Sequence, residues 1–294
     1  MTDKCCLLTV ASWEERFVLG LQRTLETEPV ERVAMLHYAE FAERTQANRD
    51  AAMAMLSQRG VKCDDISIAF SDPPGSWHTI NKRLRESDEP VVIDFTTMPR
   101  EALWVALSIL RDQGRTTSYV YNSPEDYQEW LSRDPGRPRL VYKLSGLASL
   151  GRPTCLVITT GFDPERTRQL MWYFEPRRIL LGFQAGQQFE NQRKNVERHR
   201  TALMEEYREF EVQEFDLNAY SADRGESVLV REVEPQRESY NIVMTSLGPK
   251  LGAVAIFSVQ ARFPEISLCY TPSNEFNIDY SKGIGQSYSA TIQW

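Results

Sequence analysis

Short motifs recur along this chain at nearly one spacing, and this repetition limits the fold more than any other feature of the sequence. Glu15-Arg16 is followed 150 residues later by Glu165-Arg166, and Pro99-Arg100 is followed at the same distance by Pro249-Lys250. Such internal similarity indicates two copies of one structural unit. With 294 residues, the chain is long enough for two domains of ordinary size.

Three further matches fall in the same order along the two halves. They are Thr96-Thr97 with Thr245-Ser246, Tyr121-Asn122-Ser123-Pro124 with Tyr270-Thr271-Pro272, and Ser145-Gly146 with Gly151 against Ser281-Lys282-Gly283-Ile284-Gly285. The alternative explanation is that folds of this class converge on similar residues at their strand ends. We favour duplication and predict one domain over residues 1–150 and a second over residues 151–294.

Strand-like and helix-like segments alternate in both halves. The N-terminal half is predicted to hold strands at 5–11, 33–38, 61–70, 91–95 and 117–121, with helices at 13–25, 41–58, 77–85 and 101–112. The C-terminal half is predicted to hold strands at 155–159, 178–181, 210–215, 242–244, 266–270 and 288–294, with helices at 163–174, 191–208 and 251–261. Such alternation is typical of parallel sheets covered by helices. The predicted fold class is α/β, with two Rossmann-like units related by a tandem pseudo-duplication.

Composition excludes several classes of protein. The hydrophobic fraction of 41% excludes a wholly disordered chain, and the net charge of −7 argues against a general nucleic-acid coat. Nucleic acid would therefore bind only through a local basic pocket. No run approaches the ~18 apolar residues of a membrane span. The five cysteines are scattered, which favours free thiols in a reducing cytoplasm, and we expect neither a metal nor a cofactor.

The turn after the fourth strand of each half is the sharpest candidate ligand site. In open parallel sheets, ligands bind beyond the carboxyl ends of the strands. Hydroxyls, a cation and a helix N-terminus suit a phosphate there. The residues concerned are Thr96, Thr97 and Arg100 in the first half, and Thr245, Ser246 and Lys250 in the second. The alternative is that the hydroxyls cap the following helix and that the cation is solvated.

A second set of candidates follows the first strand of each half or lies near the last turns. An aromatic ring at these positions could stack on a base. The set comprises Ser12, Trp13, Arg16, Gly161, Arg166, Tyr121, Tyr280 and Ser281. The alternatives are helix capping, an internal Glu–Arg pair and wall packing by the tyrosines.

Catalytic residues are not identified by any motif. The chain has no G-x-S-x-G, no H-E-x-x-H and no G-x-G-x-x-G after its first strand. Its three histidines have no partner that the sequence reveals, and we interpret them as structural or solvated. The catalytic set is therefore left unknown.

The segment Asp94-Phe95-Thr96-Thr97-Met98-Pro99-Arg100 resembles the ligand loop of the CRISPR-associated Rossmann-fold (CARF) sensor domains. In that family the loop contacts a cyclic oligoadenylate, and two domains pair around a two-fold axis. Two such units in one chain resemble the SAVED architecture of antiphage defence. The resemblance implies that the two turns after the fourth strands face each other across a cleft and hold the ligand phosphates.

Three classes of function remain open at this stage. The first is a nucleotide-binding sensor or regulatory subunit of antiphage defence that works with a protein partner carrying an effector activity. The second is an enzyme that cleaves a nucleotide or a phosphodiester, as a ring nuclease does. The third is a structural subunit of a larger defence or nucleic-acid complex. The fold alone does not decide among them.

Overall fold

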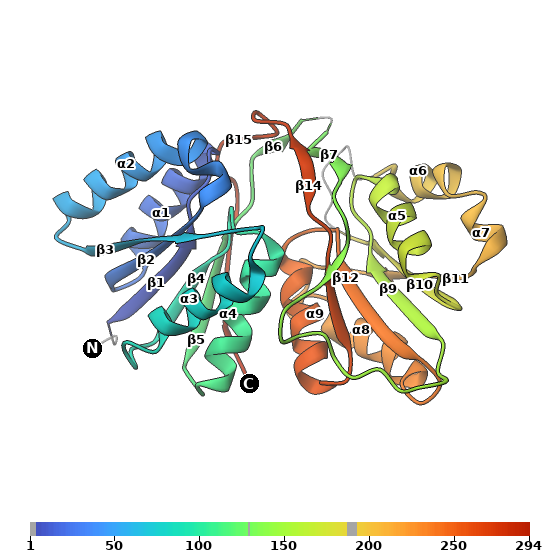
Figure 1. Cartoon of the computed structure of the whole chain (residues 1–294). Coiled ribbons are helices and arrows are strands. Elements are labelled where there is room, and N and C mark those ends of the chain that lie inside the picture. The colour runs from blue at the N-terminus through green and yellow to red at the C-terminus, as the bar shows by residue number, and fades with distance from the viewer. Residues whose placement is uncertain (1–3, 129, 187–192) are drawn as a thin grey trace. The chain divides into compact units, whose positions relative to one another are not determined.

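The computed structural model describes residues 4–128, 130–186 and 193–294. The chain forms two compact α/β units, each built around a six-stranded sheet (Figure 1). Unit 1 comprises Met1–Gln128 together with Ile278–Trp294, and unit 2 comprises Glu129–Asn277. The predicted fold class, α/β with two Rossmann-like units, is thus correct.

Unit 1 has a parallel sheet of five strands with an antiparallel sixth strand at one edge. The strand order is β16-β5-β4-β1-β2-β3. Its strands are β1 (Cys5–Val10), β2 (Val30–Tyr38), β3 (Lys62–Ile68), β4 (Val91–Asp94), β5 (Thr117–Asn122) and β16 (Ser287–Ile292). Its helices are α1 (Glu15–Thr27), α2 (Ala42–Gln58), α3 (Pro73–Leu84) and α4 (Arg100–Asp112).

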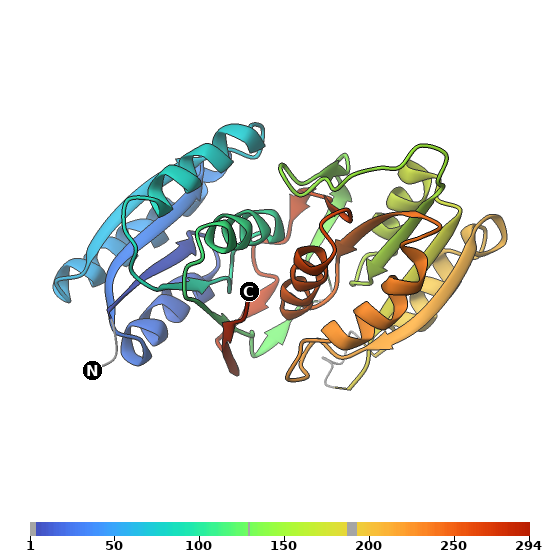
Figure 2. The ribbon, with the colours of Figure 1, turned by 90° about the horizontal axis from the view of Figure 1, so that it is seen from below.

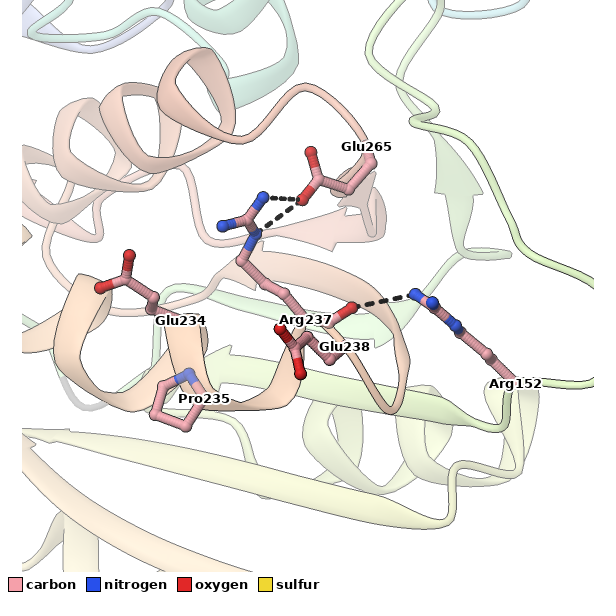
Figure 3. A pocket seen from close by; sticks show the side chains of 6 residues that line it. All are labelled: Arg152, Glu234, Pro235, Arg237, Glu238 and Glu265. Atoms are coloured by element: carbon pink, nitrogen blue, oxygen red, sulfur yellow. Dashed lines mark hydrogen bonds and ion pairs between the residues drawn. The ribbon is translucent and has the colours of Figure 1, made fainter.

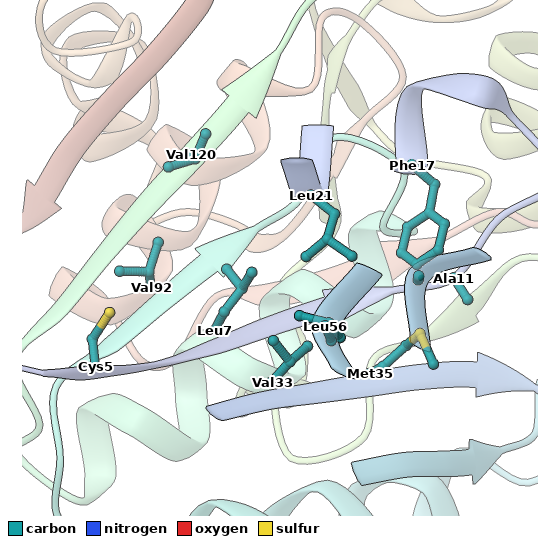
Figure 4. Close-up of a cluster of buried hydrophobic side chains, with 11 residues drawn as sticks. Cys5, Leu7, Ala11, Phe17, Leu21, Val33, Met35, Leu56, Val92 and Val120 are labelled. Atoms are coloured by element: carbon teal, nitrogen blue, oxygen red, sulfur yellow. The ribbon is translucent and has the colours of Figure 1, made fainter. Parts of the chain in front are cut away.

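Helices cover both faces of the sheet in unit 1 (Figure 2). Leu21 of α1 and Leu56 of α2 pack against Leu7 and Val33 of the central strands (Figure 4). Helices α3 and α4 contact each other and cover the other face. All six residues of β1 are buried because helices lie on both sides of it. This explains why the strand is a continuous apolar run rather than an alternating one.

The sheet of unit 2 has the strand order β11-β10-β9-β12-β13-β8. This is the order of unit 1 read from the opposite edge, with β9 in the place of β1 and β12 in the place of β4. Its sheet strands are β8 (Arg139–Leu140), β9 (Thr154–Thr159), β10 (Arg178–Gln184), β11 (Glu211–Leu217), β12 (Asn241–Ser246) and β13 (Ser267–Tyr270). Its helices are α5 (Pro164–Phe174), α6 (Asn195–Ala202), α7 (Glu206–Glu209), α8 (Glu226–Val233) and α9 (Leu251–Arg262). Equal strand order in both units is the arrangement that duplication predicts.

The division of the chain differs from the predicted boundary between residues 150 and 151. Strand β16 lies at the C-terminal end of the chain but pairs antiparallel with β5 of unit 1. Strand β8 precedes β9 and pairs antiparallel with β13 of unit 2. In each unit, the sixth strand covers a sheet edge that would otherwise expose unpaired backbone groups. The pattern of the sequence does not specify which edge a short strand will cover.

Each unit also carries a two-stranded antiparallel ribbon. In unit 1, β6 (Asp126–Tyr127) pairs with β15 (Ser281–Lys282). In unit 2, β7 (Ser132–Pro135) pairs with β14 (Ser273–Phe276). The two ribbons thus join segments that are far apart in the sequence.

The remaining local predictions hold with small changes in their bounds. The helix predicted over residues 191–208 is two helices, α6 and α7, and its first two residues lie outside the described residues. None of the described helices is long and apolar enough to cross a membrane. All five cysteines are free thiols, and burial raises the pKa of Cys5 and of Cys63 to about 11.

Candidate functional site

Arg16 lies at the centre of a buried polar cluster in unit 1. It is the second residue of α1 and is 1% exposed. Its Nη2 donates to Glu14 Oε2 at 2.6 Å, its Nε donates to Ser281 Oγ at 3.0 Å, and its Nη1 donates to the Asn122 carbonyl at 3.3 Å. The arginine therefore uses all three of its nitrogens inside the protein.

Glu14 completes this cluster. Its carboxylate accepts hydrogen bonds from Ser281 Oγ at 2.8 Å and from the Tyr280 hydroxyl. Burial alone would lower the pKa of Arg16, but the Glu14 carboxylate reverses the effect and raises it well above its usual range. Burial and the same carboxylate raise the pKa of Tyr280. The cluster is thus a closed, charge-compensated ion pair, and Arg16, Tyr280 and Ser281 are brought together as parts of it.

The hydroxyls of the turn after β4 also make contacts within unit 1. Thr96 Oγ1 accepts from the backbone N and the Nδ2 of Asn122, at 3.0 and 3.1 Å. Thr97 Oγ1 donates to the Val10 carbonyl at 2.8 Å. Both threonines are buried, and these bonds fasten the turn to the neighbouring strands. Arg100 begins α4 and is half-buried.

Ser12 and Trp13 lie in the loop after β1. Ser12 Oγ accepts from the Glu14 backbone N at 3.2 Å. The Trp13 ring meets Phe41 edge to face, and the Arg44 guanidinium lies 5.3 Å from its centre. Ser12 thus bonds the residue before α1 and not the helix itself, and the N-cap residue Glu14 makes no side-chain capping hydrogen bond.

Tyr121 is 2% exposed at the end of β5. Its ring stacks on Phe95, and its hydroxyl lies 3.4 Å from the hydroxyl of Tyr127. The Tyr121 ring is therefore packed in the interior of unit 1.

Arg166 in unit 2 has different surroundings from Arg16. It is the third residue of α5 and is half-buried. Its Nη2 donates to Ser132 Oγ at 2.8 Å and to Ser273 Oγ. Its Nε is buried and has no hydrogen-bond partner among the described residues. Burial lowers the pKa of Arg166, while Tyr270 and Asp163 act in the opposite direction.

No carboxylate of the described residues forms an ion pair with Arg166. Glu14 stands two residues before Arg16, whereas Pro164 stands two residues before Arg166. The acidic residue just upstream, Asp163, accepts from the Glu165 backbone N at 3.0 Å and caps α5. Among the described residues, the Arg166 guanidinium is therefore held by neutral hydroxyls, those of Ser132 and Ser273.

Ser132 of unit 2 corresponds to Ser281 of unit 1. Both serines contact the arginine of their unit, and both begin a Ser-(Arg or Lys)-x-x-Gly segment. The third residue of each segment has a positive φ, 51° at Asp134 and 60° at Gly283. In unit 2, Leu131 stands where unit 1 has Tyr280, so unit 2 keeps the arginine and the serine but lacks the phenol.

This correspondence replaces the predicted match of Ser145-Gly146 with Ser281. The Ser145 carbonyl accepts from Ser267 Oγ at 2.7 Å, and Gly146 lies against the backbone of Glu265. These contacts are at the amino end of β13, whereas we expected a ligand at the carboxyl ends of the strands.

The other candidates of unit 2 lie at the carboxyl ends of β9 and β12. Thr245 and Ser246 are buried, and Ser246 Oγ accepts from Thr159 Oγ1 at 3.4 Å. Lys250 precedes α9 and is half-buried. Gly161 lies so close to Leu247 that an added Cβ would be 2.1 Å from its carbonyl oxygen. Close backbone packing is therefore a sufficient reason for this glycine.

A pocket of about 580 Å³ lies at the amino end of the strands of unit 2 (Figure 3). Arg237 and Glu265 form an ion pair there at 2.6 Å, and Arg152 donates to the Arg237 carbonyl at 3.1 Å. These groups have partners within the pocket wall. The pocket is also at the wrong edge for ligand binding by a parallel sheet.

Sequence reasoning missed Ser132 and Ser273 as members of the arginine site of unit 2, and it gave Glu14 only through the alternative of an internal Glu–Arg pair. The signal for Ser132 was present, because the Ser-(Arg or Lys)-x-x-Gly segment occurs in both halves. The contact of Ser273 with Arg166 depends on the ribbon of unit 2, which no local pattern reveals. Within the described ranges, no group of His, Cys, Asp and Glu side chains could hold a metal ion.

Comparisons with known proteins give a likeness of fold. No family model matches the chain, and no curated protein matches its sequence. A solved type III CRISPR defence DNA nuclease that is activated by cyclic oligoadenylate superposes with a TM-score of 0.57 at 10% identity. The match covers 86% of this chain but 63% of the nuclease, so this chain spans less than two thirds of that protein's length.

A second solved structure also matches. It is the cytoplasmic domain of a prokaryotic cation chloride cotransporter, with a TM-score of 0.30 at 12% identity over 94% of this chain and 98% of that one. At this score, the likeness carries no argument about the site.

Proposed function

We propose that this protein is a nucleotide-binding sensor or regulatory subunit of antiphage defence. In this proposal, a ligand phosphate binds Arg166 at the carboxyl ends of the parallel strands in unit 2. The turn that holds Thr245, Ser246 and Lys250 follows a neighbouring strand of the same sheet and supplies further contacts. The effector activity resides on a protein partner.

The observation that carries the proposal is the state of Arg166. A buried guanidinium group is normally paired with a carboxylate, because leaving water costs a charge several kcal/mol. Arg166 is half-buried and donates only to Ser132 and Ser273 among the described residues. Its Nε still has a hydrogen to donate. A phosphate would provide both the missing negative charge and acceptors for a planar fork of donors.

The class of ligand rests on two likenesses. The turn after β4 resembles the ligand loop of the CARF sensor domains, and the solved nuclease with the same fold is activated by cyclic oligoadenylate. Both support a nucleotide over a simple anion. We therefore place cyclic oligoadenylates first among the ligands to be tested.

Calorimetric titration tests the proposal. The panel comprises AMP, ATP, cyclic dinucleotides and cyclic oligoadenylates of several ring sizes. We expect the parent to bind one of them and Arg166→Ala to weaken that binding roughly tenfold to a hundredfold, because charge-assisted hydrogen bonds contribute about 1.5–3 kcal/mol. Pro164→Glu should weaken it as well, since it brings a carboxylate two residues before Arg166, as Glu14 stands before Arg16.

Arg231→Ala is the matched control. Arg231 lies in the same unit, is exposed and forms a surface ion pair with Glu232, so its removal should leave the affinity unchanged. Lys250→Ala and Arg100→Ala test the two turns separately. Equal affinity in the parent and Arg166→Ala, or no binding to any member of the panel, would contradict the proposal. Chromatography of the recovered nucleotide shows whether it has been cleaved, which would favour the enzyme instead.

A further inference from the structure

Unit 1 has an arginine and a serine in the positions that correspond to those of unit 2, but in unit 1 a carboxylate is hydrogen-bonded to both. Glu14 accepts from Arg16 at 2.6 Å and from Ser281 at 2.8 Å. We propose that these groups form an anion-binding site that the chain fills with its own Glu14 side chain. In unit 2, by contrast, a free anion has to fill the corresponding position beside Arg166.

The site in unit 1 is built to hold an anion. The side chains of Arg16 and Glu14 are 2% and 4% exposed. Arg16 supplies two nitrogens to one carboxylate oxygen, and Ser281 and Tyr280 supply hydroxyl donors to the two oxygens. Glu14 also immediately precedes α1, a helix of 13 residues, whose N-terminus favours negative charge. Carboxylate and phosphate oxygens accept from the same donors, so a small oxyanion suits this set of groups.

The comparison of the two units supports the assignment. Relative to unit 2, unit 1 adds a carboxylate through Glu14 and a phenol through Tyr280, where unit 2 has Pro164 and Leu131 at the same sequence spacing. The Tyr280 hydroxyl donates to Glu14, and the Arg16 guanidinium lies 6.0 Å from the centre of the Tyr280 ring. If the proposed function holds, on which this consequence rests, then a free ligand is sensed at the arginine of unit 2 and not at that of unit 1.

Chemical rescue of a cavity variant tests the internal anion. Glu14→Ala is made in the Arg166→Ala background, which removes the arginine of unit 2 from the experiment. The melting temperature is then measured in sodium phosphate, sodium acetate and sodium chloride at equal ionic strength. We expect phosphate and acetate to raise the melting temperature of this double variant by about 5 °C more than that of Arg166→Ala alone, since a ligand stabilises the state that binds it.

Two controls define the site. Glu14→Gln fills the same space with a neutral amide and should show no response to either anion. Adding Arg16→Met to Glu14→Ala removes the cation and should abolish the rescue. If Glu14→Ala does not fold in chloride, its refolding in phosphate provides the same readout, and recovery in phosphate alone supports the proposal.

The result that overturns the inference is an equal response of the variants with and without Glu14. It is distinguishable from failure of the proposed function, because the rescue is measured without nucleotide and without Arg166. A parent that binds no nucleotide while Glu14→Ala is rescued by phosphate would contradict the sensor and leave the internal anion supported. A parent that binds nucleotide through Arg166 while no variant is rescued would support the sensor and contradict the internal anion.

Discussion

Arg16 and Arg166 lie in the first turns of equivalent helices in two units of equal strand order, yet they are held in different ways. Arg16 is compensated by Glu14 inside unit 1. Arg166 is held by the hydroxyls of two serines, and no carboxylate of the described residues pairs with it. The same position in one fold thus carries an arginine that is paired with a carboxylate in unit 1 and one that donates to hydroxyls in unit 2.

The difference depends on very few residues. Both arginines contact a serine of the ribbon, Ser281 in unit 1 and Ser132 in unit 2. What separates the units is whether an acidic residue lies two positions before the arginine. An arginine at a predicted ligand site is therefore informative only together with the charges next to it, because a buried partner already satisfies it.

The largest expected effect is the loss of stability on Glu14→Ala. Removing one partner of a buried ion pair leaves an uncompensated charge, which typically costs about 3–5 kcal/mol. Pro164→Ala, at the same spacing from Arg166, should change the free energy of unfolding by less than about 1 kcal/mol, since no ion pair is lost. Chemical denaturation of both variants measures the two values. Equal losses would mean that the two arginines are held alike.

Acid should weaken unit 2 before unit 1. Burial lowers the pKa of His199 to about 4, while the ordinary value is 6.5. The unfolded chain therefore takes up this proton first as the pH falls. The stability that neutral His199 provides is complete above about pH 6.5 and is lost progressively towards pH 4, by about 3 kcal/mol in total. Neither histidine of unit 1, His37 or His78, is fully buried.

Hydrogen exchange at pH 7, 5.5 and 4.5 follows the two units separately. We expect protection in unit 2 to fall with the pH more steeply than protection in unit 1. His199→Gln should flatten this dependence. A fall of equal size in the parent and the variant would assign the acid sensitivity to other groups.

Much of the fold could be predicted because the signals are local. Strands β1 and β4 of unit 1 and β9 of unit 2 are buried, mostly apolar runs followed by helices, so a parallel α/β sheet could be predicted in each half. The boundary between the units could not be predicted in this way. Strands β8 and β16 have two and six residues, and their pairing with β13 and β5 depends on which sheet edges are left open.

The positions of the two arginines could be predicted from the sequence, but most of their hydrogen-bond partners could not. The sequence placed Arg16 and Arg166 after the first strand of each half, and the structure has them there. The carboxylate partner of Arg16 is local, but the serine partners depend on the ribbons, which bring Ser281 to Arg16 and Ser132 to Arg166 across more than 30 residues of sequence. Such contacts have no local pattern, and the roles of all these residues in binding stay predictions.

The smallest effect concerns Gly161, which we predicted as a ligand contact and for which the structure offers packing against Leu247. An added Cβ would meet the Leu247 carbonyl oxygen at 2.1 Å, so Gly161→Ala should cost about 1–3 kcal/mol through overpacking. Gly252→Ala is the matched control. Gly252 lies within α9, where an added Cβ meets only the Ala219 side chain at 3.6 Å, and alanine should stabilise the helix by about 0.5–1 kcal/mol. Urea denaturation of unit 2 measures both changes. If Gly161→Ala instead keeps the stability of the parent but loses nucleotide affinity, then the glycine makes room for a ligand, and the loop after β9 belongs to the binding site together with Arg166.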